Sequence, residues 1–531
     1  MRIMVSMLVA SLVAAQATVQ AAATGYPERW NYARAELGSD KGLDAFLDVL
    51  RQSKEVGCTH IQMVEGRWFR TPNDPGYLGR VAKVRAYAKE NGLTLVPCVY
   101  SLGYSGRYLG LDPNLCAGLP VRDMPFVVHG GKAVADPALA VNVSGVKAVD
   151  SRMSGTVKLR PFTHYRITFS SPAELPGDAE EWLRVAGKVG SRWLNRRDLD
   201  SRREGGRHLF ETTFNSLEAE EASVRIGAVV QDLKIEPAGL LMVVRRALCP
   251  LKVTSADGQT VYQEGRDFQP VVDPKLRTDG EFVATHEAPA IQLAADSRIK
   301  DGDTLRVSFF HAYRMGSDQD VISMEDPKVF EIMEQDMANC AKVWQAEGYF
   351  MNYDEIRIGG WETPDRKPGQ ILADHVKKGY EIVRRHAPQA KIYTWSDMFT
   401  PFHNARPFSV KGYYYLVNGN WDGAWEGLSK DVIIMNWYAK ERPAVQFFSD
   451  RGHKQVICGY YDGTTTEKMK NNIAGWMKVT EGAPNILGFM YTTWRKNYKN
   501  LKEYFGLLDT FPQWGQAATA APSSKIPGAT D

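Results

Sequence analysis

The sequence lacks several patterns that would assign a function at once. Its six cysteines are scattered and none forms a C-x-x-C pair, so their spacing does not indicate a zinc site. It has no phosphate-cradling glycine loop, no cluster of metal ligands and no Ser-His-Asp arrangement. The formal net charge is only +3, which gives no electrostatic reason to expect binding to nucleic acid or a membrane surface. We therefore expect no metal, no cofactor and no nucleic-acid partner.

Long apolar runs are also missing, except at the N-terminus. Residues 1–23 combine a positive start at Arg2, a mostly apolar stretch through Val13 and small residues at the end, which is the pattern of a secretory signal peptide. The stretch is short for a membrane span. It has no cysteine near its end to which a lipid anchor could be attached. We expect a periplasmic or secreted protein without a membrane anchor.

Aromatic residues are abundant, with 13 Trp and 23 Tyr, and many of them follow glycine, asparagine or aspartate in the second half of the chain. Aromatic faces beside polar groups suit sugar rings, which offer C–H faces and hydroxyl edges. A large hydrophobic core would also account for this composition.

Strand and helix patterns alternate in two segments, 24–104 and 301–515. The predicted strands are 29–36, 59–64, 93–100, 349–353, 391–395, 432–436, 455–459 and 486–492. The predicted helices are 43–56, 77–88, 327–347, 370–386, 443–450, 468–479 and 500–508. Eight strand–helix units are the count of an α/β protein with a (β/α)8 TIM barrel.

The segment between these two parts, 105–300, has a β texture instead. Short alternating runs separated by turn residues predict a jelly-roll-like β-sandwich at about 130–240, similar to carbohydrate-binding modules. A smaller β-rich piece covers 251–272, with a hairpin signal at 256–259. The insertion follows strand three, and the tail at 516–531 has the composition of a disordered segment.

The carboxyl ends of barrel strands hold the chemistry of TIM-barrel enzymes. In chain order the predicted strand ends carry Arg34 and Glu36, Glu65 and Arg67, Tyr100 and Tyr104, Asp354 and Glu355, Trp395 and Asp397, Trp437 and Tyr438, Tyr460 with Tyr461 and Asp462, and Trp494. One ring of strand ends thus collects aromatic side chains, a carboxylate pair and a few arginines. This combination resembles a pocket for a terminal sugar.

The carboxylate pair, Asp354 and Glu355, follows the apolar run 348–353. Adjacent side chains start from opposite faces of a strand, but both can reach one pocket where the strand bends into its loop. Two carboxylates in one pocket do not both ionise freely, so one pKa tends to rise and a general acid stands beside a charged partner. We take this pair as the candidate catalytic residues.

These strand ends resemble the catalytic barrel of glycoside hydrolase family 20, the β-N-acetylhexosaminidases. The resemblance covers the barrel segments only and rests on the order Arg34, Asp354-Glu355, Trp395, Trp437, Tyr460 or Tyr461, and Trp494. It implies a retaining, substrate-assisted hydrolysis of a 2-acetamido sugar, in which the acetamido oxygen attacks the anomeric carbon. Glu355 would then be the general acid and base, and Asp354 would stay ionised and orient the acetamido N–H. The resemblance implies Arg34, Trp395, Trp437, Tyr460, Tyr461 and Trp494 as substrate-binding residues. Their places at strand ends add Glu65, Arg67 and Asp397 to the predicted substrate-binding set.

The sequence departs from the family pattern on both sides of this set. The family usually has His-x-Gly-Gly before its Asp-Glu, whereas this chain has Met351, Asn352 and Tyr353. Arg495 and Lys496 follow the last tryptophan, where the family often has an acidic residue, and these cations would suit an anionic sugar.

Two further hypotheses remain open. Glu355 could act as acid while Asp397 or Asp462 serves as nucleophile or base in a retaining or inverting glycosidase. Alternatively, the barrel is degenerate and the β-sandwich makes this a non-catalytic glycan-binding protein. In each case the partner is a glycan or oligosaccharide.

Overall fold

The computed structural model describes residues 28–172, 174, 182–187, 192–195, 200–276, 286–315, 319–437, 442–459 and 461–511. The expected signal peptide at 1–23, the expected tail at 516–531 and the candidate residue Tyr460 lie outside these residues.

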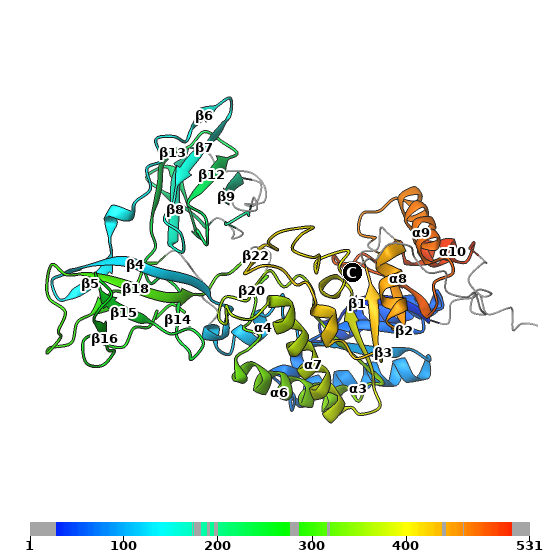
Figure 1. The fold of residues 1–531 in the computed structure, drawn as a ribbon. Helices are drawn as coiled ribbons and strands as arrows, with labels where there is room; N and C mark the ends of the chain where they lie inside the picture. The colour runs from blue at the N-terminus through cyan, green and yellow to red at the C-terminus, as the bar shows by residue number, and fades with distance from the viewer. Residues whose placement is uncertain are drawn as a thin grey trace, which may run out of the picture.

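Eight parallel strands close into a barrel, which confirms the predicted (β/α)8 fold (Figure 1). In barrel order they are β1 (Glu28–Arg34), β2 (His60–Val64), β3 (Thr94–Val99), β19 (Gly348–Met351), β21 (Lys391–Trp395), β23 (Val432–Asn436), β24 (Gln455–Cys458) and β25 (Ile486–Tyr491). The barrel closes where β1 pairs with β25, with Asn31 opposite Tyr491.

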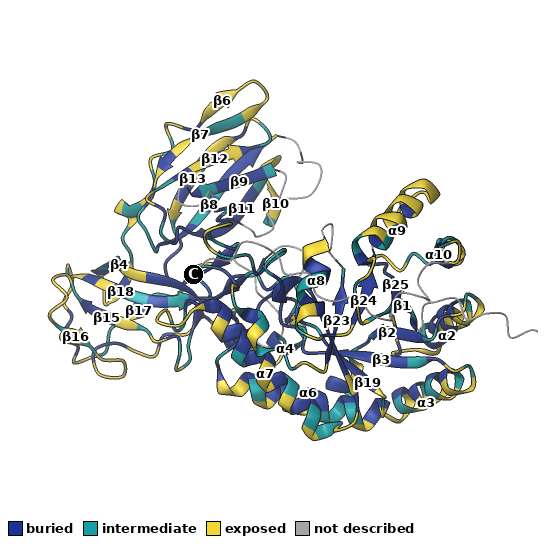
Figure 2. Ribbon diagram, turned by 45° about the vertical axis from the view of Figure 1, so that its right-hand side comes forward, coloured by how far each residue is buried: buried dark blue, intermediate teal, exposed yellow. Residues whose placement is uncertain are grey.

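The helices of the barrel cover the strands from outside, where Figure 2 shows them with one buried and one exposed face. They are α2 (Asp40–Glu55), α3 (Pro75–Glu90), α6 (Pro327–Trp344), α7 (Pro368–His386), α8 (Arg442–Asp450), α9 (Thr466–Thr480) and α10 (Leu501–Leu508), and a short α4 (Gly106–Leu109) follows β3. Several of these helices have an N-terminal capping side chain. Ser39, Asp74 and Asp326 accept hydrogen bonds from the first turns of α2, α3 and α6.

Alternate residues of the barrel strands point inward and fill the barrel. This inner cluster contains Trp30, Tyr32, Val96, Cys98, Phe350, Tyr393, Trp395, Ile433, Met435, Val456, Cys458 and Met490. The period of two follows from strand geometry, and large inward side chains leave a packed core instead of a pore. The open space for a ligand must therefore lie at the strand ends.

No α-helix directly follows strand five among the described residues, and none of the seven predicted helices falls between strands five and six. Every residue from 396 to 431 is described, and this stretch contains no α-helix. It forms the 3-10 helices η5 (Asp397–Phe399) and η6 (Ala424–Gly427) and the short strand β22 (Leu416–Val417). Two prolines and three glycines between 401 and 423 remove backbone donors and favour turns, so a continuous helix is not available there. β22 pairs with β20 (Ile358–Gly359) and builds a rim over the barrel.

The insertion between β3 and β19 contains two β units that stand to one side of the barrel (Figure 1). One is a seven-stranded sheet of β4 (Leu119–His129), β5 (Lys132–Ala135), β14 (Val243–Val244), β15 (Lys252–Ser255), β16 (Val261–Tyr262), β17 (Ile291–Gln292) and β18 (Thr304–His311). The other is a sandwich of two four-stranded sheets. The first holds β8 (His164–Ser171), β10 (Asp200–Glu204), β11 (Arg207–Asn215) and β13 (Gln231–Pro237), and the second holds β6 (Lys147–Val149), β7 (Arg152–Lys158), β9 (Leu183–Gly187) and β12 (Glu221–Ile226).

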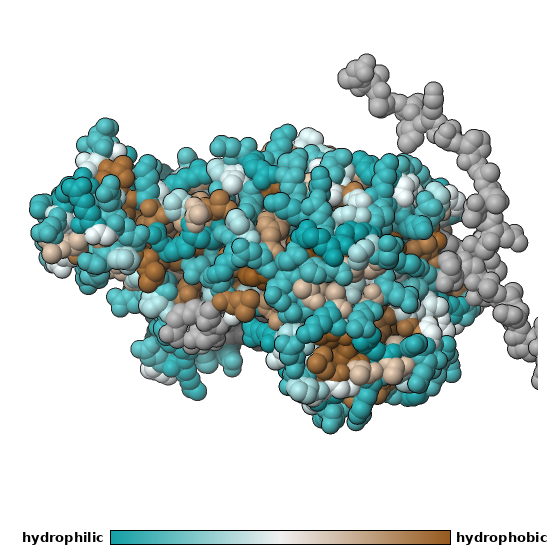
Figure 3. All heavy atoms as spheres, turned by 90° about the horizontal axis from the view of Figure 1, so that it is seen from below, coloured by the Kyte–Doolittle hydropathy of each residue, from teal (hydrophilic) through white to brown (hydrophobic). Residues whose placement is uncertain are grey.

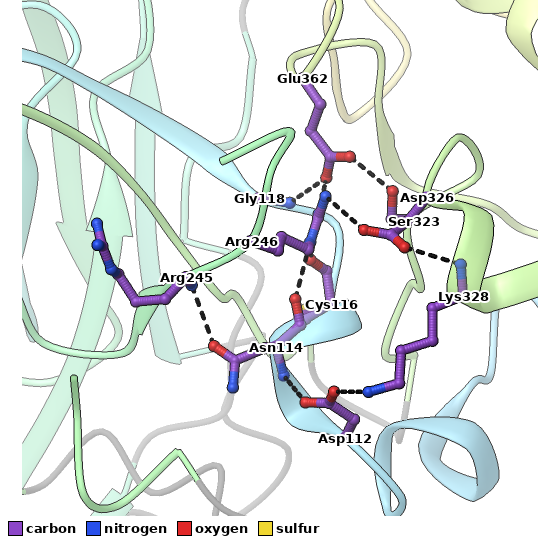
Figure 4. A network of polar contacts seen from close by, with 10 residues as sticks. All are labelled: Asp112, Asn114, Cys116, Gly118, Arg245, Arg246, Ser323, Asp326, Lys328 and Glu362. Atoms are coloured by element: carbon purple, nitrogen blue, oxygen red, sulfur yellow. Dashed lines mark hydrogen bonds and ion pairs between the residues drawn. The ribbon is translucent and has the colours of Figure 1, made fainter. Parts of the chain in front are cut away.

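A buried ion pair joins the insertion to the barrel (Figure 4). Arg246 of the insertion contacts Glu362, which follows the barrel strand β19, and their side chains are only 7% and 8% exposed. Glu362 also accepts hydrogen bonds from the backbone N–H of Gly118 at 2.9 Å and from the hydroxyl of Ser323 at 2.6 Å. Arg246 donates to the carbonyl oxygens of Asn114 at 2.8 Å and Cys116 at 3.1 Å. Both chain connections to the insertion, near 116 and near 323, therefore meet at one network.

No helix within the described residues is long and apolar enough to cross a membrane. Figure 3 shows a face on which hydrophilic residues prevail and apolar residues gather in separate patches.

Removing one partner of the buried pair should destabilise the protein strongly. In Glu362→Ala the buried guanidinium of Arg246 loses its hydrogen-bonded counter-charge, while Asp326 remains 3.7 Å away. Removing one partner of a buried pair typically costs about 3–5 kcal/mol in the free energy of unfolding, and the remaining carboxylate places the expected loss at the lower end of this range. Urea unfolding followed by tryptophan fluorescence measures this loss. The exposed pair Arg366–Asp374 provides the control, because Asp374→Ala should cost no more than about 1 kcal/mol. Equal losses in the two variants would contradict a structural role for the joint.

Candidate active site

Asp354 and Glu355 lie just beyond β19, at the carboxyl end of the barrel, where the chain turns sharply. Glu355 has a φ of 46°, a left-handed conformation that costs a non-glycine residue about 1–2 kcal/mol. Its backbone N–H donates to Oδ2 of Asp397 at 3.1 Å. Gly103 packs against the same turn, and a Cβ on Gly103 would lie 2.1 Å from the carbonyl oxygen of Asp354. A side chain from strand five and a glycine after strand three thus fix the turn that presents both carboxylates.

The carboxylate of Glu355 is held by three side chains. Gln319 donates from Nε2 at 2.7 Å, Arg357 forms an ion pair at 3.1 Å, and the hydroxyl of Tyr104 donates to the same oxygen as Gln319. Burial, followed by the charge of Glu355, raises the pKa of Tyr104, so this hydroxyl stays a donor. The side chain of Glu355 is 26% exposed and remains accessible to a ligand.

None of these three partners was predicted as a site residue, although Tyr104 was named among the residues at the strand ends. Arg357 stands two residues after Glu355, so a cation at that spacing was a visible signal. Gln319 gives no signal in the sequence, because it lies in the return from the insertion, 36 residues before Glu355.

Asp397 is fully buried, with 0% of its surface exposed. Besides the N–H of Glu355, it accepts a hydrogen bond from Nδ2 of Asn404 at 2.9 Å and one from Nε1 of Trp437 at 3.4 Å. Burial raises the pKa of Asp397 to about 7; the charge of Glu355 raises it as well, while these donors oppose the shift. The structure therefore places Asp397 behind the turn at 354–355, as a support for Glu355.

Asp354 also has a raised pKa, caused first by burial and then by the negative charges of Asp397 and Glu355. Its Oδ1 is buried and accepts no hydrogen bond among the described residues. The raised pKa values thus fall on Asp354 and Asp397, so burial and the neighbouring charges oppose the ionised form of Asp354 that the family resemblance implies. A donor placed against Oδ1 would favour the ionised form.

Three of the predicted tryptophans gather at the mouth of the barrel. Trp395 and Trp494 meet edge to face at 5.9 Å between ring centroids, and Tyr32 contacts Trp494 in the same way at 4.9 Å. Trp494 and Trp437 are partly exposed, whereas Trp395 is almost completely buried. Trp494 and Trp437 can therefore offer aromatic surface to a ligand, while Trp395 supports them from below.

The segment that breaks the family pattern has structural roles. Asn352 accepts a hydrogen bond from Nε1 of Trp395 at 2.8 Å and donates to the hydroxyl of Ser101 at 3.1 Å. The hydroxyl of Tyr353 pairs with Nδ1 of His375 in α7 at 2.9 Å. These residues orient an aromatic side chain and anchor the strand to its helix, so the altered motif still forms an ordered strand end.

The remaining predicted residues lie at different places. Arg34 is exposed at the end of β1. Glu65 and Arg67 line a hollow of about 650 Å³ at the ends of β1 and β2, together with Arg70 and Arg107. Tyr461 is buried outside the barrel, and its hydroxyl donates to Asn472 of α9 at 2.9 Å, so it does not face the site.

Asp462, the other proposed nucleophile or base, supports a loop. Its Oδ2 accepts hydrogen bonds from the backbone N–H groups of Trp494 at 2.7 Å and Arg495 at 3.0 Å, and its Oδ1 accepts one from the hydroxyl of Thr493. Within the described part of the chain, no group of three or more His, Cys, Asp and Glu side chains could hold a metal ion.

No protein-family model and no curated protein sequence matches the chain. Among solved structures it is similar to a rhamnosidase from Novosphingobium sp. PP1Y, with 9% identity over 91% of this chain and 56% of the rhamnosidase and a TM-score of 0.35. It is also similar to the family 20 modules of a pneumococcal exo-β-D-N-acetylglucosaminidase, with 9% identity, coverage of 93% and 85%, and a TM-score of 0.37. A β-N-acetylhexosaminidase from Bacteroides fragilis gives 7% identity, coverage of 94% and 68%, and a TM-score of 0.39. These TM-scores are too low to establish a shared fold. The barrel is established by the pairing of its own eight strands.

The raised pKa of Asp397 predicts a pH-dependent cost in stability. The folded pKa of about 7 exceeds the usual carboxyl value near 4, so the folded state binds this proton more tightly than the unfolded state does. The bound proton therefore stabilises the folded state at low pH, and this stabilisation is lost as the pH rises from about 4 to about 7. Asp397→Asn removes the buried charge and should raise the unfolding free energy relative to wild type by about 2–4 kcal/mol more at pH 8 than at pH 4.

Thermal unfolding of both proteins at the two pH values checks this difference. Asp44→Asn, at an exposed position on α2, serves as the matched control and should leave the difference near zero. The same pH dependence in wild type and Asp397→Asn would show that this carboxyl does not carry the shifted proton.

Proposed function

We propose that the protein is a glycoside hydrolase that removes a terminal 2-acetamido sugar by a retaining, substrate-assisted mechanism. The observation that carries the proposal is the pairing of two unlike carboxylates at the end of strand four. Glu355 is partly exposed and held by donors, whereas Asp354 has a buried oxygen, Oδ1, with no donor among the described residues. The N–H of an acetamido group would supply that missing donor.

The surrounding carboxylates favour a nucleophile that comes from the substrate. A protein nucleophile would need an open carboxylate near Glu355. Asp397 is fully buried beneath the turn, and Asp462 uses its oxygens on the loop after β25. Neither of the two carboxylates considered for this role is free to attack an anomeric carbon, so the acetamido oxygen is the better candidate.

The proposed reaction uses the two catalytic carboxylates in turn. Glu355 donates a proton to the glycosidic oxygen while the acetamido oxygen bonds to the anomeric carbon and the glycosidic C–O bond breaks. Asp354, in its ionised form, accepts a hydrogen bond from the acetamido N–H, and its negative charge stabilises the positive oxazolinium-like intermediate. Glu355 then takes a proton from the water that attacks the anomeric carbon, and the C–O bond to the acetamido group breaks.

Other residues position these groups and the sugar. Tyr104, Gln319 and Arg357 fix the carboxylate of Glu355, and Trp437 and Trp494 would wall the sugar ring. Since Tyr461 is turned toward α9, Tyr460 remains the proposed partner of the acetamido carbonyl. Secretion to the periplasm or the medium also remains part of the proposal.

Replacing the proposed acid should remove most of the activity. General acid catalysis typically contributes about 10²–10⁴-fold, so Glu355→Gln should lower kcat on an aryl N-acetylglucosaminide by this factor. A screen of aryl glycosides, including N-acetylgalactosaminide, galactoside and glucuronide, should show activity on 2-acetamido sugars only. Glu503→Gln, at an exposed position on α10, is the control and should retain wild-type kcat. Full activity of Glu355→Gln on a confirmed substrate would refute its assignment as the acid.

Replacing the proposed acetamido partner tests the mechanism itself. Asp354→Asn removes the charge that stabilises the intermediate and should lower kcat by about 10²–10³-fold, the usual effect of losing one such electrostatic contact. It should also weaken inhibition by a thiazoline analogue of the intermediate, because the protonated ring nitrogen of that ligand donates an N–H to the carboxylate of Asp354 and asparagine removes the charge that favours this protonation. If the thiazoline does not inhibit the wild-type enzyme, and a glucoside without the acetamido group is cleaved at the same rate as the 2-acetamido sugar, the mechanism requires a protein nucleophile instead.

A further inference from the structure

The outer sheet of the sandwich contains a hollow of about 400 Å³, which we name the arginine pocket. Its walls include Arg152, Arg184 and Arg225 and the rings of Trp182 and Trp193. These residues come from the neighbouring strands β7, β12 and β9 and from the chain beside β9, and Figure 2 shows the three strands side by side at one face of the sandwich. The pocket is separate from the strand ends of the barrel.

Strand register brings the arginines together. Ala222, Val224 and Ile226 of β12 are buried, so the intervening Arg225 points to the outer face. Arg225 pairs directly with Arg184 of β9, which is exposed between buried neighbours. Arg152 opens β7, next to the pair formed by Met153 and Ile226. Three exposed cations thus lie on one face across adjacent strands.

Two tryptophan rings, those of Trp182 and Trp193, form part of the pocket wall. Gly227 follows β12, and a Cβ there would lie 2.6 Å from the ring of Trp182, so glycine allows the ring to lie against the backbone. Trp193 stands on the other side of β9, where the guanidinium carbon of Arg184 lies 5.1 Å from its ring centroid. Both tryptophans are partly exposed and can contact a ligand.

Among the described residues, the pocket contains no negative charge that would balance its arginines. No acidic residue lines it, and Arg152, Arg184 and Arg225 form no ion pair with a carboxylate among the described residues. Like charges placed directly opposite on two strands destabilise a sheet. A bound anion would relieve this repulsion, and guanidinium groups bind carboxylate and sulfate through paired hydrogen bonds.

We propose that the arginine pocket binds an acidic saccharide unit, with its carboxylate or sulfate on the arginines and its ring against Trp182 and Trp193. The size suits one or two sugar rings, since ligand sites usually measure about 300–1,000 Å³. A net charge of only +3 for the whole chain argues against a nucleic-acid surface. The inference rests on the sandwich alone and does not require the barrel to be a hydrolase.

The sandwich that carries this pocket is fixed to the barrel. Arg192, the residue before Trp193, is buried and stacks on Tyr413 of the strand-five loop, with its guanidinium carbon 3.8 Å from the ring centroid. A glycan captured by the pocket would therefore be held near the barrel, which raises its local concentration there.

Isothermal titration calorimetry of the full chain tests the proposal with three probes: tetragalacturonate, its fully methyl-esterified form and a sulfated galactose tetrasaccharide. We expect one or both acidic probes to bind, more weakly at high salt, and the neutral ester to bind at least tenfold more weakly. The double variant Arg184→Ala/Arg225→Ala should raise the Kd of the acidic probe at least about tenfold. Preference for galacturonate or for the sulfated sugar identifies the anion.

Two variants keep the result specific. Arg203→Ala removes an exposed arginine from β10 in the opposite sheet and should leave the Kd unchanged. Trp182→Phe retains a ring and should bind better than Trp182→Ala, with thermal unfolding confirming that each variant is folded. Equal binding of the acid and its ester, absence of binding to both acidic probes at about 10 mM, or tighter binding of a single-stranded oligonucleotide through the same arginines would overturn the proposal.

Discussion

The pairing of β1 with β25 is the constraint on which the whole site depends. Once the sheet closes, the carboxyl ends of eight parallel strands meet on one face, and side chains hundreds of residues apart become neighbours. Asp397 can then accept the N–H of Glu355, and Tyr104 can reach the carboxylate of the same residue. Inward-pointing aromatic side chains fill the barrel below and leave only the strand ends open to a ligand.

The site retains features that lower the stability of the folded chain. Asp397 is a buried carboxyl with a raised pKa, and Glu355 adopts a left-handed backbone conformation. Surrounding contacts keep both features in place. The turn is held by the hydrogen bond from the backbone N–H of Glu355 to Asp397 and by close packing against Gly103. The same arrangement aims a partly exposed carboxylate and a buried acceptor oxygen at one place, as the proposed chemistry requires.

The sequence predicted the barrel well because its strands are apolar runs and its helices have periodic faces and capping residues such as Ser39 and Asp74. It also predicted the Asp354–Glu355 pair, because strand order alone places it at a strand end. It could not predict Gln319, which reaches Glu355 only after the insertion has folded back, nor that Tyr461 turns outward toward Asn472. The direction of a side chain beyond a strand end depends on packing between distant segments, which pattern reasoning does not contain.

The place of the insertion also has a consequence for the order of folding. Strand three and strand four, β3 and β19, are neighbours in the sheet, but roughly 250 residues separate them, which a ribosome adds in about 12–50 s. During synthesis β1, β2 and β3 can pair with one another, but β3 must wait for β19 and β1 for β25, and the whole insertion emerges before either of these strands. When β19 emerges, Arg246 has already been synthesised and Glu362 follows directly, so the buried pair that joins the insertion to the barrel is completed only with the second half of the barrel.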